Sequence, residues 1–194
     1  MTGSTAAGGL RSGLEDCGWK LVRGATILGL LALAGCEQVE ELRDHFEDAT
    51  PREAYEAALM SAGLAGTALV REWADAAQLA LAEPVPVDAP FRETGYLEEE
   101  RPTAVGYRVL ALRGQRISVA IRLEGDTAAK VFVDVFRAPT DPLEAPTHLV
   151  SADSGSRALE FEPRRDGHYL IRIQPELFIG GRYTLEIQNE PSLA

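Results

Sequence analysis

Histidine and cysteine are the first side chains to consider for chemistry, because they supply many of the nucleophiles and metal ligands of proteins. The 194-residue chain has three histidines, His45, His148 and His168, and two cysteines, Cys17 and Cys36. No two histidines have the spacing of a metal-binding motif such as H-E-x-x-H. The sequence also has neither a G-x-S-x-G motif nor a glycine-rich phosphate loop. We therefore expect no catalytic residues, no metal site and no cofactor.

Four aspartates form a further set of candidate ligands, and each lies in a predicted turn: Asp126, Asp141, Asp153 and Asp166. Aspartate is favoured in turns because its carboxylate accepts hydrogen bonds from nearby backbone amides. Calcium takes oxygen ligands, so a calcium site built from two of these turns is an alternative to purely local hydrogen bonding.

The charge balance bears on the partners of the chain. Lys and Arg together number 19 and Asp and Glu number 30, which gives a net charge of -11 at pH 7. Because phosphate binding needs clustered Lys and Arg, this balance argues against nucleic acid as a partner. The hydrophobic content of 45% and the charged content of 25% are typical of a folded globular protein.

Cys36 follows a segment with the features of an export signal. Lys20 and Arg23 precede an uncharged, mostly apolar run at 24–35. A helix of this length would rise about 18 Å, which is too short for a hydrocarbon core of about 30 Å. A basic flank followed by a short apolar run is typical of a signal peptide. The end of the run, Leu33-Ala34-Gly35-Cys36, resembles the bacterial lipobox.

The lipobox resemblance implies that 1–35 is a signal peptide and that Cys36 becomes lipidated. In lipobox proteins the chain is cut before the cysteine, whose sulfur carries a diacylglyceryl group and whose amine is then acylated. We therefore expect a lipid anchor in a bacterial membrane. Glu37 rather than Asp follows the cysteine, which favours the outer over the inner membrane, with the chain facing the periplasm or the exterior. Residues 36–50 form a predicted helical tether.

Residues 51–82 are predicted to form a helical hairpin. Thr50 and Glu53 have the spacing of a capping box, which marks the start of a helix. Gly63 suits a left-handed residue after the end of that helix, and Thr67 can cap a second one. A single unbroken helix is less favoured, because glycine costs about 1 kcal/mol against alanine inside a helix.

A Pro-rich linker is predicted at 83–103, where three prolines occur within seven residues. Inside it, 91–96 is either a short strand or an ordered loop. The side chains of Trp73, Arg92 and Tyr96 are a predicted interaction surface. For Trp73, packing onto the following domain is the competing interpretation.

From residue 104 the apolar residues alternate with a period of two, which predicts strands. About seven short strands in 104–190 predict an antiparallel all-β sandwich, so the whole chain is assigned to the α+β class. The last two strands share the pattern Gly-x-Tyr-x-apolar-x-Ile-Gln, at 167–174 and 181–188. Tyrosine here is expected to cover the open end of the sandwich with its hydroxyl in water. The stretch 104–189 resembles the bacterial pre-peptidase C-terminal domain, which implies a non-catalytic β-sandwich.

The order of the motifs also resembles the non-catalytic amino-terminal region of lipid-anchored peptidoglycan metallopeptidases of the lysostaphin (LytM-like) type. The residues that carry this resemblance are Leu33 to Cys36, Thr50 to Tyr55, Ala62 to Leu64, Trp73, Pro90 to Tyr96 and Gly167 to Tyr183. In such proteins a zinc-binding catalytic domain follows the sandwich, and its zinc ligands have no counterpart in this sequence.

We therefore expect a bacterial envelope lipoprotein that acts as a non-catalytic binding or positioning module, with peptidoglycan or a cell-wall peptidase as its partner. One alternative is the truncated accessory part of a zinc endopeptidase whose catalytic domain lies downstream. The other is a purely structural tethered spacer.

Overall fold

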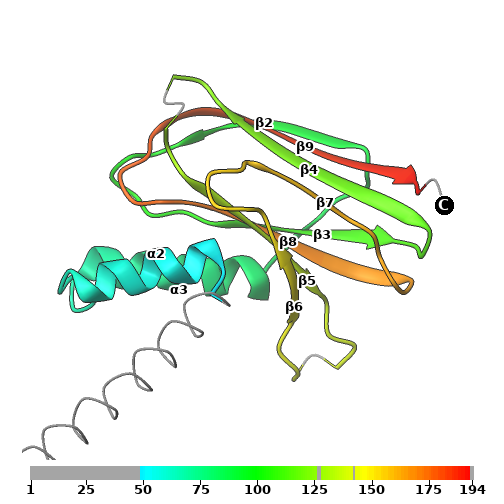
Figure 1. The fold of residues 1–194 in the computed structure, drawn as a ribbon, viewed down its shortest axis with the longest axis horizontal. Helices are drawn as coiled ribbons and strands as arrows, with labels where there is room; N and C mark the ends of the chain where they lie inside the picture. Colours follow the sequence, from blue (N-terminus) through cyan, green and yellow to red (C-terminus); the bar gives the residue numbers. More distant parts are fainter. Residues whose placement is uncertain (1–48, 126–127, 142, 193–194) are drawn as a thin grey trace, which may run out of the picture. The chain divides into compact units, whose positions relative to one another are not determined.

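The computed structural model describes residues 49–125, 128–141 and 143–192, and Figure 1 shows their arrangement as two sheets with a helical hairpin against one of them. The predicted signal peptide, Cys36 and nearly all of the predicted tether lie outside the described residues. From residue 49 onward the chain belongs to one compact unit. Its elements are α2 (Pro51–Ser61), α3 (Ala68–Ala82), β1 (Val85–Pro86), β2 (Phe91–Leu97), β3 (Val105–Ala111), β4 (Gln115–Leu123), β5 (Val131–Arg137), β6 (Thr147–Ser151), β7 (Ala158–Phe161), β8 (Gly167–Pro175) and β9 (Gly181–Pro191).

Helix α2 begins and ends with the capping features that the sequence predicts. The Thr50 hydroxyl accepts a hydrogen bond from the Glu53 amide at 3.3 Å, and the Glu53 carboxylate accepts one from the Thr50 amide at 2.9 Å. The Thr50 amide holds the pKa of Glu53 below its usual value. At the other end Gly63 has a φ of 76°, and the Leu64 amide donates to the Leu59 carbonyl at 3.0 Å. These contacts form a Schellman motif, which stops the helix.

Helix α3 has its own cap, since the Thr67 hydroxyl accepts a hydrogen bond from the Val70 amide at 3.3 Å. Two capped helices separated by a short turn confirm the predicted hairpin.

The strands form two sheets, in the orders β1-β3-β8-β5-β6 and β2-β9-β4-β7. Neighbouring strands are antiparallel except for β1 and β3, which are parallel. This arrangement confirms the predicted antiparallel sandwich and hairpin. The two Gly-x-Tyr strands, β8 and β9, lie in different sheets, so each sheet receives one copy of the pattern.

The sandwich begins earlier in the chain than the sequence indicates. Strands β1 and β2 both fall inside 83–103, the stretch predicted as a Pro-rich linker, and β2 pairs with β9 over seven residues. Along β2 the side chains alternate between exposed and partly buried positions. The strand was ambiguous in the sequence because only its inward residues contact the core.

The main core lies between the two sheets and consists of their inward residues. Its most deeply buried members are Tyr107, Val109, Ile117, Val119, Val133, Val135, Ile171, Leu185 and Ile187. On β5 the alternate residues Phe132 and Phe136 are also buried, because they face the other way, toward the hairpin side of the sheet. Strand β5 is therefore covered on both faces, which agrees with its run of apolar residues, interrupted only by Asp134.

A second, smaller core joins the hairpin to the five-stranded sheet. Tyr55 and Trp73 from the helices pack with Phe132 of β5 and with Leu177, which follows β8. The ring centroids of Tyr55 and Trp73 lie 5.4 Å apart, as do those of Tyr55 and Phe132. Burial of these side chains supplies the hydrophobic driving force for docking the hairpin.

Polar contacts fix the position of the hairpin on the sheet. The Arg52 guanidinium donates to the Gln174 side chain at 2.6 Å, and Gln174 donates to the Trp73 carbonyl at 2.7 Å. The Trp73 indole donates to the Pro175 carbonyl at 2.8 Å. Helix α3 also approaches β3 closely at Gly106, where a Cβ atom would overlap the Ala80 carbonyl. Hairpin and sandwich thus form one packed structure.

Candidate binding pocket

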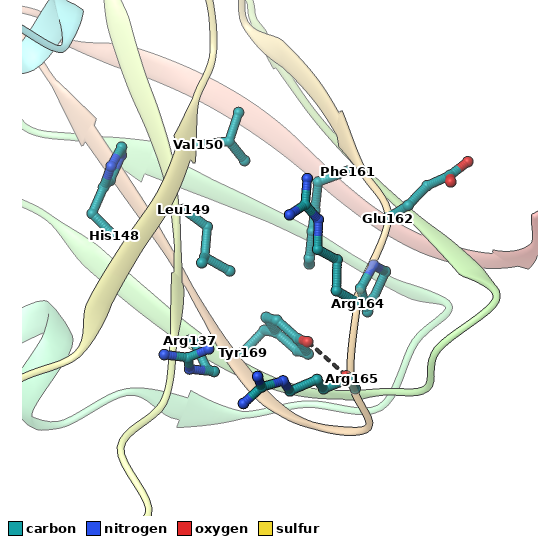
Figure 2. Close-up of a pocket in the computed structure, with 10 residues that line it drawn as sticks. Arg137, His148, Leu149, Val150, Phe161, Glu162, Arg164, Arg165 and Tyr169 are labelled. Carbon is teal, nitrogen blue, oxygen red and sulfur yellow. Dashed lines mark hydrogen bonds between the residues drawn. The ribbon is translucent and has the colours of Figure 1, made fainter. Parts of the chain in front are cut away.

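The described chain has a pocket of about 520 Å³ where the two sheets part, between their edge strands β6 and β7. Both strands are short, with five and four residues, so they leave inward side chains uncovered between the sheets. Figure 2 shows these side chains around the hollow. The pocket is lined by Arg137, His148, Leu149, Val150, Phe161, Glu162, Pro163, Arg164, Arg165 and Tyr169.

The floor of the pocket is apolar. The rings of Phe161 and Tyr169 lie 5.2 Å apart between centroids. Beside them, Leu149 reaches the pocket because β6 carries a bulge: Val150 pairs with Val135 and His148 with Phe136, which leaves Leu149 without a partner on β5. Leu149 keeps 42% of its surface exposed. The bulge thus contributes an apolar side chain to the floor.

Three arginines surround this floor. Arg137 ends β5, while Arg164 and Arg165 lie in the connection from β7 to β8, and all three are exposed. Within the described part of the chain, none of the three forms an ion pair. The pocket therefore has a cationic rim in a chain whose net charge is -11.

The single carboxylate of the lining, Glu162, is committed elsewhere. It accepts hydrogen bonds from the Ser192 hydroxyl at 2.6 Å and from Arg116 at 3.2 Å. The Ser192 hydroxyl, with Arg116 second, lowers the pKa of Glu162. Figure 2 shows this side chain pointing away from the hollow, so it does not neutralise the arginines.

The tyrosines of the two Gly-x-Tyr strands are positioning residues, and here the sequence-based expectation of wet hydroxyls is wrong. The Tyr169 hydroxyl donates to the Arg165 carbonyl at 2.7 Å and so holds the connection that carries two of the arginines. The Tyr183 hydroxyl donates to the Glu93 carboxylate at 2.6 Å, and the Tyr107 hydroxyl donates to the same oxygen at 3.0 Å. Both hydroxyls stabilise the fold, because each donates a hydrogen bond to another group of the protein.

A serine, a histidine and an aspartate meet beside the pocket without forming a catalytic triad. Ser151 donates its proton to Asp134 at 2.6 Å, and a His148 ring nitrogen lies 2.9 Å from the same hydroxyl. A nucleophilic serine would instead give its proton to the histidine. The second Asp134 oxygen accepts from Arg172 at 2.7 Å. This arrangement therefore stabilises the fold. The sequence feature that indicates it is Asp134, a carboxylate among the apolar residues of β5.

The structure separates the three residues of the predicted interaction surface. Trp73 has no exposed surface, so its assignment to that surface is wrong; it packs under the hairpin, as the competing interpretation held. Tyr96 is 71% exposed and the Arg92 side chain 69%, and both point outward from β2. Strands β2 and β7 are opposite edges of their sheet, so these two residues lie far across the sheet from the pocket.

Among the described residues no group of three or more histidine, cysteine or acidic side chains could hold a metal ion. Of the turn aspartates, Asp141 accepts a local hydrogen bond from the Leu143 amide at 2.9 Å, and Asp166 accepts one from the Arg113 amide, distant in sequence, at 2.8 Å. Asp126 lies outside the described residues. In the same described part of the chain, the helices are too short or too polar to cross a membrane.

The fold and the pocket define a β-sandwich with a docked helical hairpin and an open, cationic edge. No protein-family description matches the chain, and no curated protein matches it.

Several solved structures are similar to about half of the chain. They include a periplasmic inhibitor of g-type lysozyme from Aeromonas hydrophila, at 18% identity over 55% of this chain and 96% of the inhibitor, with a TM-score of 0.41. The pre-peptidase C-terminal domain of a collagenase from Bacillus anthracis matches at 13% identity over 55% of this chain and 95% of that domain, with a TM-score of 0.43. The corresponding inhibitor from Salmonella Typhimurium matches at 18% identity over 54% and 97%, with a TM-score of 0.36. The likeness concerns the β fold alone.

Proposed function

We propose that this chain is a lipid-anchored module of the bacterial cell envelope that binds and positions a cell-wall component without catalysing a reaction. The observation that carries the proposal is the pocket at the sandwich edge, because its apolar floor and cationic rim are suited to holding a ligand. The ionisable groups beside it support a binding role rather than a catalytic one, since Asp134 is held by Ser151 and Arg172.

The place of action in this proposal comes from the lipobox at Leu33 to Cys36. An acylated Cys36 would tether the sandwich at the membrane, and Glu37 directs it to the outer membrane. The resemblance to the non-catalytic region of lysostaphin-type peptidases supports peptidoglycan, or an enzyme that acts on it, as the component that is bound. The module would then concentrate such an enzyme or its substrate near the membrane.

The anchor is tested by radiolabelled palmitate in a bacterial host that produces the full chain. We expect label in the wild type and in a Cys17→Ser variant, which is the matched control because Cys17 precedes the predicted cleavage site. We expect none in Cys36→Ser. Label that persists in Cys36→Ser, or an unmodified Cys36 by mass spectrometry, would reject the anchor.

Binding is tested by sedimentation of the detergent-purified full chain with purified peptidoglycan sacculi. We expect the protein to pellet with the sacculi and to release no soluble fragments from them. A protein that stays in the supernatant would favour a simple spacer. Release of fragments would show that the chain is an enzyme.

A further inference from the structure

The lining of the pocket between β6 and β7 favours a particular kind of ligand. Resting on the proposed function, we infer that the pocket binds a short peptide with two or more carboxylates, the chemistry of the stem peptide of peptidoglycan. Three features of the pocket favour such a ligand: the charge of its rim, its apolar floor and the free edge of β6.

The rim supplies cations that match carboxylates. Arg137, Arg164 and Arg165 are exposed and form no ion pair within the described part of the chain. A guanidinium presents a planar fork of N–H donors that fits a carboxylate in a bidentate way. Because the three arginines come from two separate segments, they suit a ligand that carries more than one anionic group.

The same charges favour a short ligand over a long polyanion. The whole chain carries a net charge of -11, so a polymer of phosphates would meet repulsion once it extended beyond the pocket. Screening limits these interactions to about 8 Å at physiological ionic strength. A ligand that fits within about 520 Å³ therefore experiences mainly the three arginines.

The floor requires apolar groups next to the anionic ones. Leu149, which is 42% exposed, and the partly buried Phe161 would remain in contact with water if only a free phosphate or a simple carboxylate were bound. Covering them contributes roughly 25 cal/mol per Å² of apolar surface. A peptide of alanyl and acidic residues brings methyl and methylene groups together with its carboxylates.

Strand β6 ends its sheet, so its outer backbone groups have no neighbouring strand within the described residues. Such an edge can pair with an extended peptide. A peptide alongside β6 would run past Leu149 and could place alternate side chains over the pocket, with its carboxylates at the arginines. This geometry favours an extended peptide over a sugar chain.

The test is calorimetric titration of the full chain with the soluble stem peptide L-alanyl-γ-D-glutamyl-meso-diaminopimelate. We expect binding that weakens as salt is raised. The same peptide with all carboxylates amidated, an N-acetylglucosamine oligomer, inorganic phosphate and phosphatidylglycerol vesicles serve as competing probes, and none of them should bind comparably. Equal or tighter binding of any one of these would overturn the inference.

Paired variants place the site. Arg164→Gln/Arg165→Gln should weaken peptide binding at least about tenfold, because charge-assisted hydrogen bonds are lost. The control Arg71→Gln/Arg108→Gln removes the same charge from exposed arginines outside the lining and should leave binding unchanged. A second pair avoids the arginines: Leu149→Asp should abolish binding, whereas Leu110→Asp, at an exposed position of β3 outside the pocket, should not.

The outcomes separate the inference from the proposed function. If Arg164→Gln/Arg165→Gln binds the stem peptide as tightly as the control does, the inference fails. If that variant is still acylated and still pellets with sacculi, the proposed function stands even so. If the wild type is neither acylated nor retained by sacculi, the proposed function fails. Far-ultraviolet circular dichroism of each variant verifies that the fold is intact.

Discussion

Asp134 and Arg172 form an ion pair that is almost wholly withdrawn from water, with 1% and 7% of their surfaces exposed. One Asp134 oxygen accepts from two nitrogens of Arg172, at 2.7 and 3.1 Å, and the other accepts from Ser151. The guanidinium also lies 4.9 Å from the centroid of the Phe136 ring. Removing one charge would leave the other buried and unpaired, which costs more than the pair contributes.

We therefore predict that Asp134→Ala lowers the free energy of unfolding by about 3–5 kcal/mol, measured by urea denaturation. The double variant Asp134→Leu/Arg172→Met should recover most of this loss, because neither charge then remains buried. Glu162→Ala is the control: it breaks a solvent-exposed pair with Arg116, so its effect on stability should be much smaller than that of Asp134→Ala. Equal losses in the single and double variants would contradict the argument.

The two tyrosines that share Glu93 make stability sensitive to alkaline pH. Burial, with Glu93 second, raises the pKa of Tyr183 to about 12, and burial also raises the pKa of Tyr107. In the unfolded chain a tyrosine loses its proton near pH 10. Folding thus favours the neutral phenols. Their contribution is complete below pH 10 and is lost as the pH rises toward 12.

We predict that the free energy of unfolding falls steeply above pH 10 in the wild type and less steeply in Tyr183→Phe. At pH 7 the same variant should be less stable by about 1 kcal/mol, because the hydrogen bond to Glu93 is lost. Tyr96→Phe, at an exposed tyrosine on β2, should follow the wild-type pH profile. The measurement is urea denaturation at a series of pH values, and superimposable profiles for Tyr183→Phe and the wild type would refute the prediction.

At the scale of elements, the closest approach of α3 to the sheet depends on one glycine. A Cβ atom on Gly106 of β3 would overlap the Ala80 carbonyl, which belongs to the backbone and cannot rotate aside. We predict that Gly106→Ala costs about 2–3 kcal/mol in chemical denaturation, since the helix must move away. Gly66→Ala, in the turn of the hairpin with open space around it, should change stability by no more than about 0.5 kcal/mol. Similar losses in both variants would show that α3 does not need this contact.

The elements also show which features local sequence can predict. The caps at Thr50 and Gly63 depend on residues within five positions of each other, and the strands from β3 onward follow from alternation, so both were predicted correctly. Strand β2 was ambiguous because its register depends on β9, about ninety residues later. The burial of Trp73 depends likewise on Phe132 and Pro175. Neither distant partner is visible in a local pattern.

The pocket was missed for the same reason. Its residues come from β5, β6, β7, the β7–β8 connection and β8, and no sequence motif joins them. Leu149 enters it only because of the bulge in β6, which alternation alone does not predict. The pair Arg164-Arg165 was a usable signal, because two adjacent arginines stand out in an acidic chain. Only the fold, however, places Arg137 near them.

At the scale of the whole molecule, hairpin and sandwich depend on each other. The outer face of the five-stranded sheet buries Phe132, Phe136 and Leu170. Without α2 and α3 it would expose an apolar patch, which folded monomers rarely tolerate. Gln174, which has no exposed surface, would also lose its bonds to Arg52 and Trp73. We infer that neither part unfolds alone.

This interdependence predicts a single cooperative transition for the chain 36–194, in which Trp73 is the sole tryptophan. Its fluorescence reports on the contact between hairpin and sheet, while far-ultraviolet circular dichroism reports on secondary structure throughout, so both signals should give one urea midpoint. In Tyr55→Phe, which removes the hydrogen bond to the Leu177 amide, both midpoints should shift down together by the equivalent of about 1 kcal/mol. If the fluorescence midpoint alone moved, the hairpin would be a separate module docked on a sandwich that is stable without it, because only then could Trp73 become exposed while the sheets stay folded.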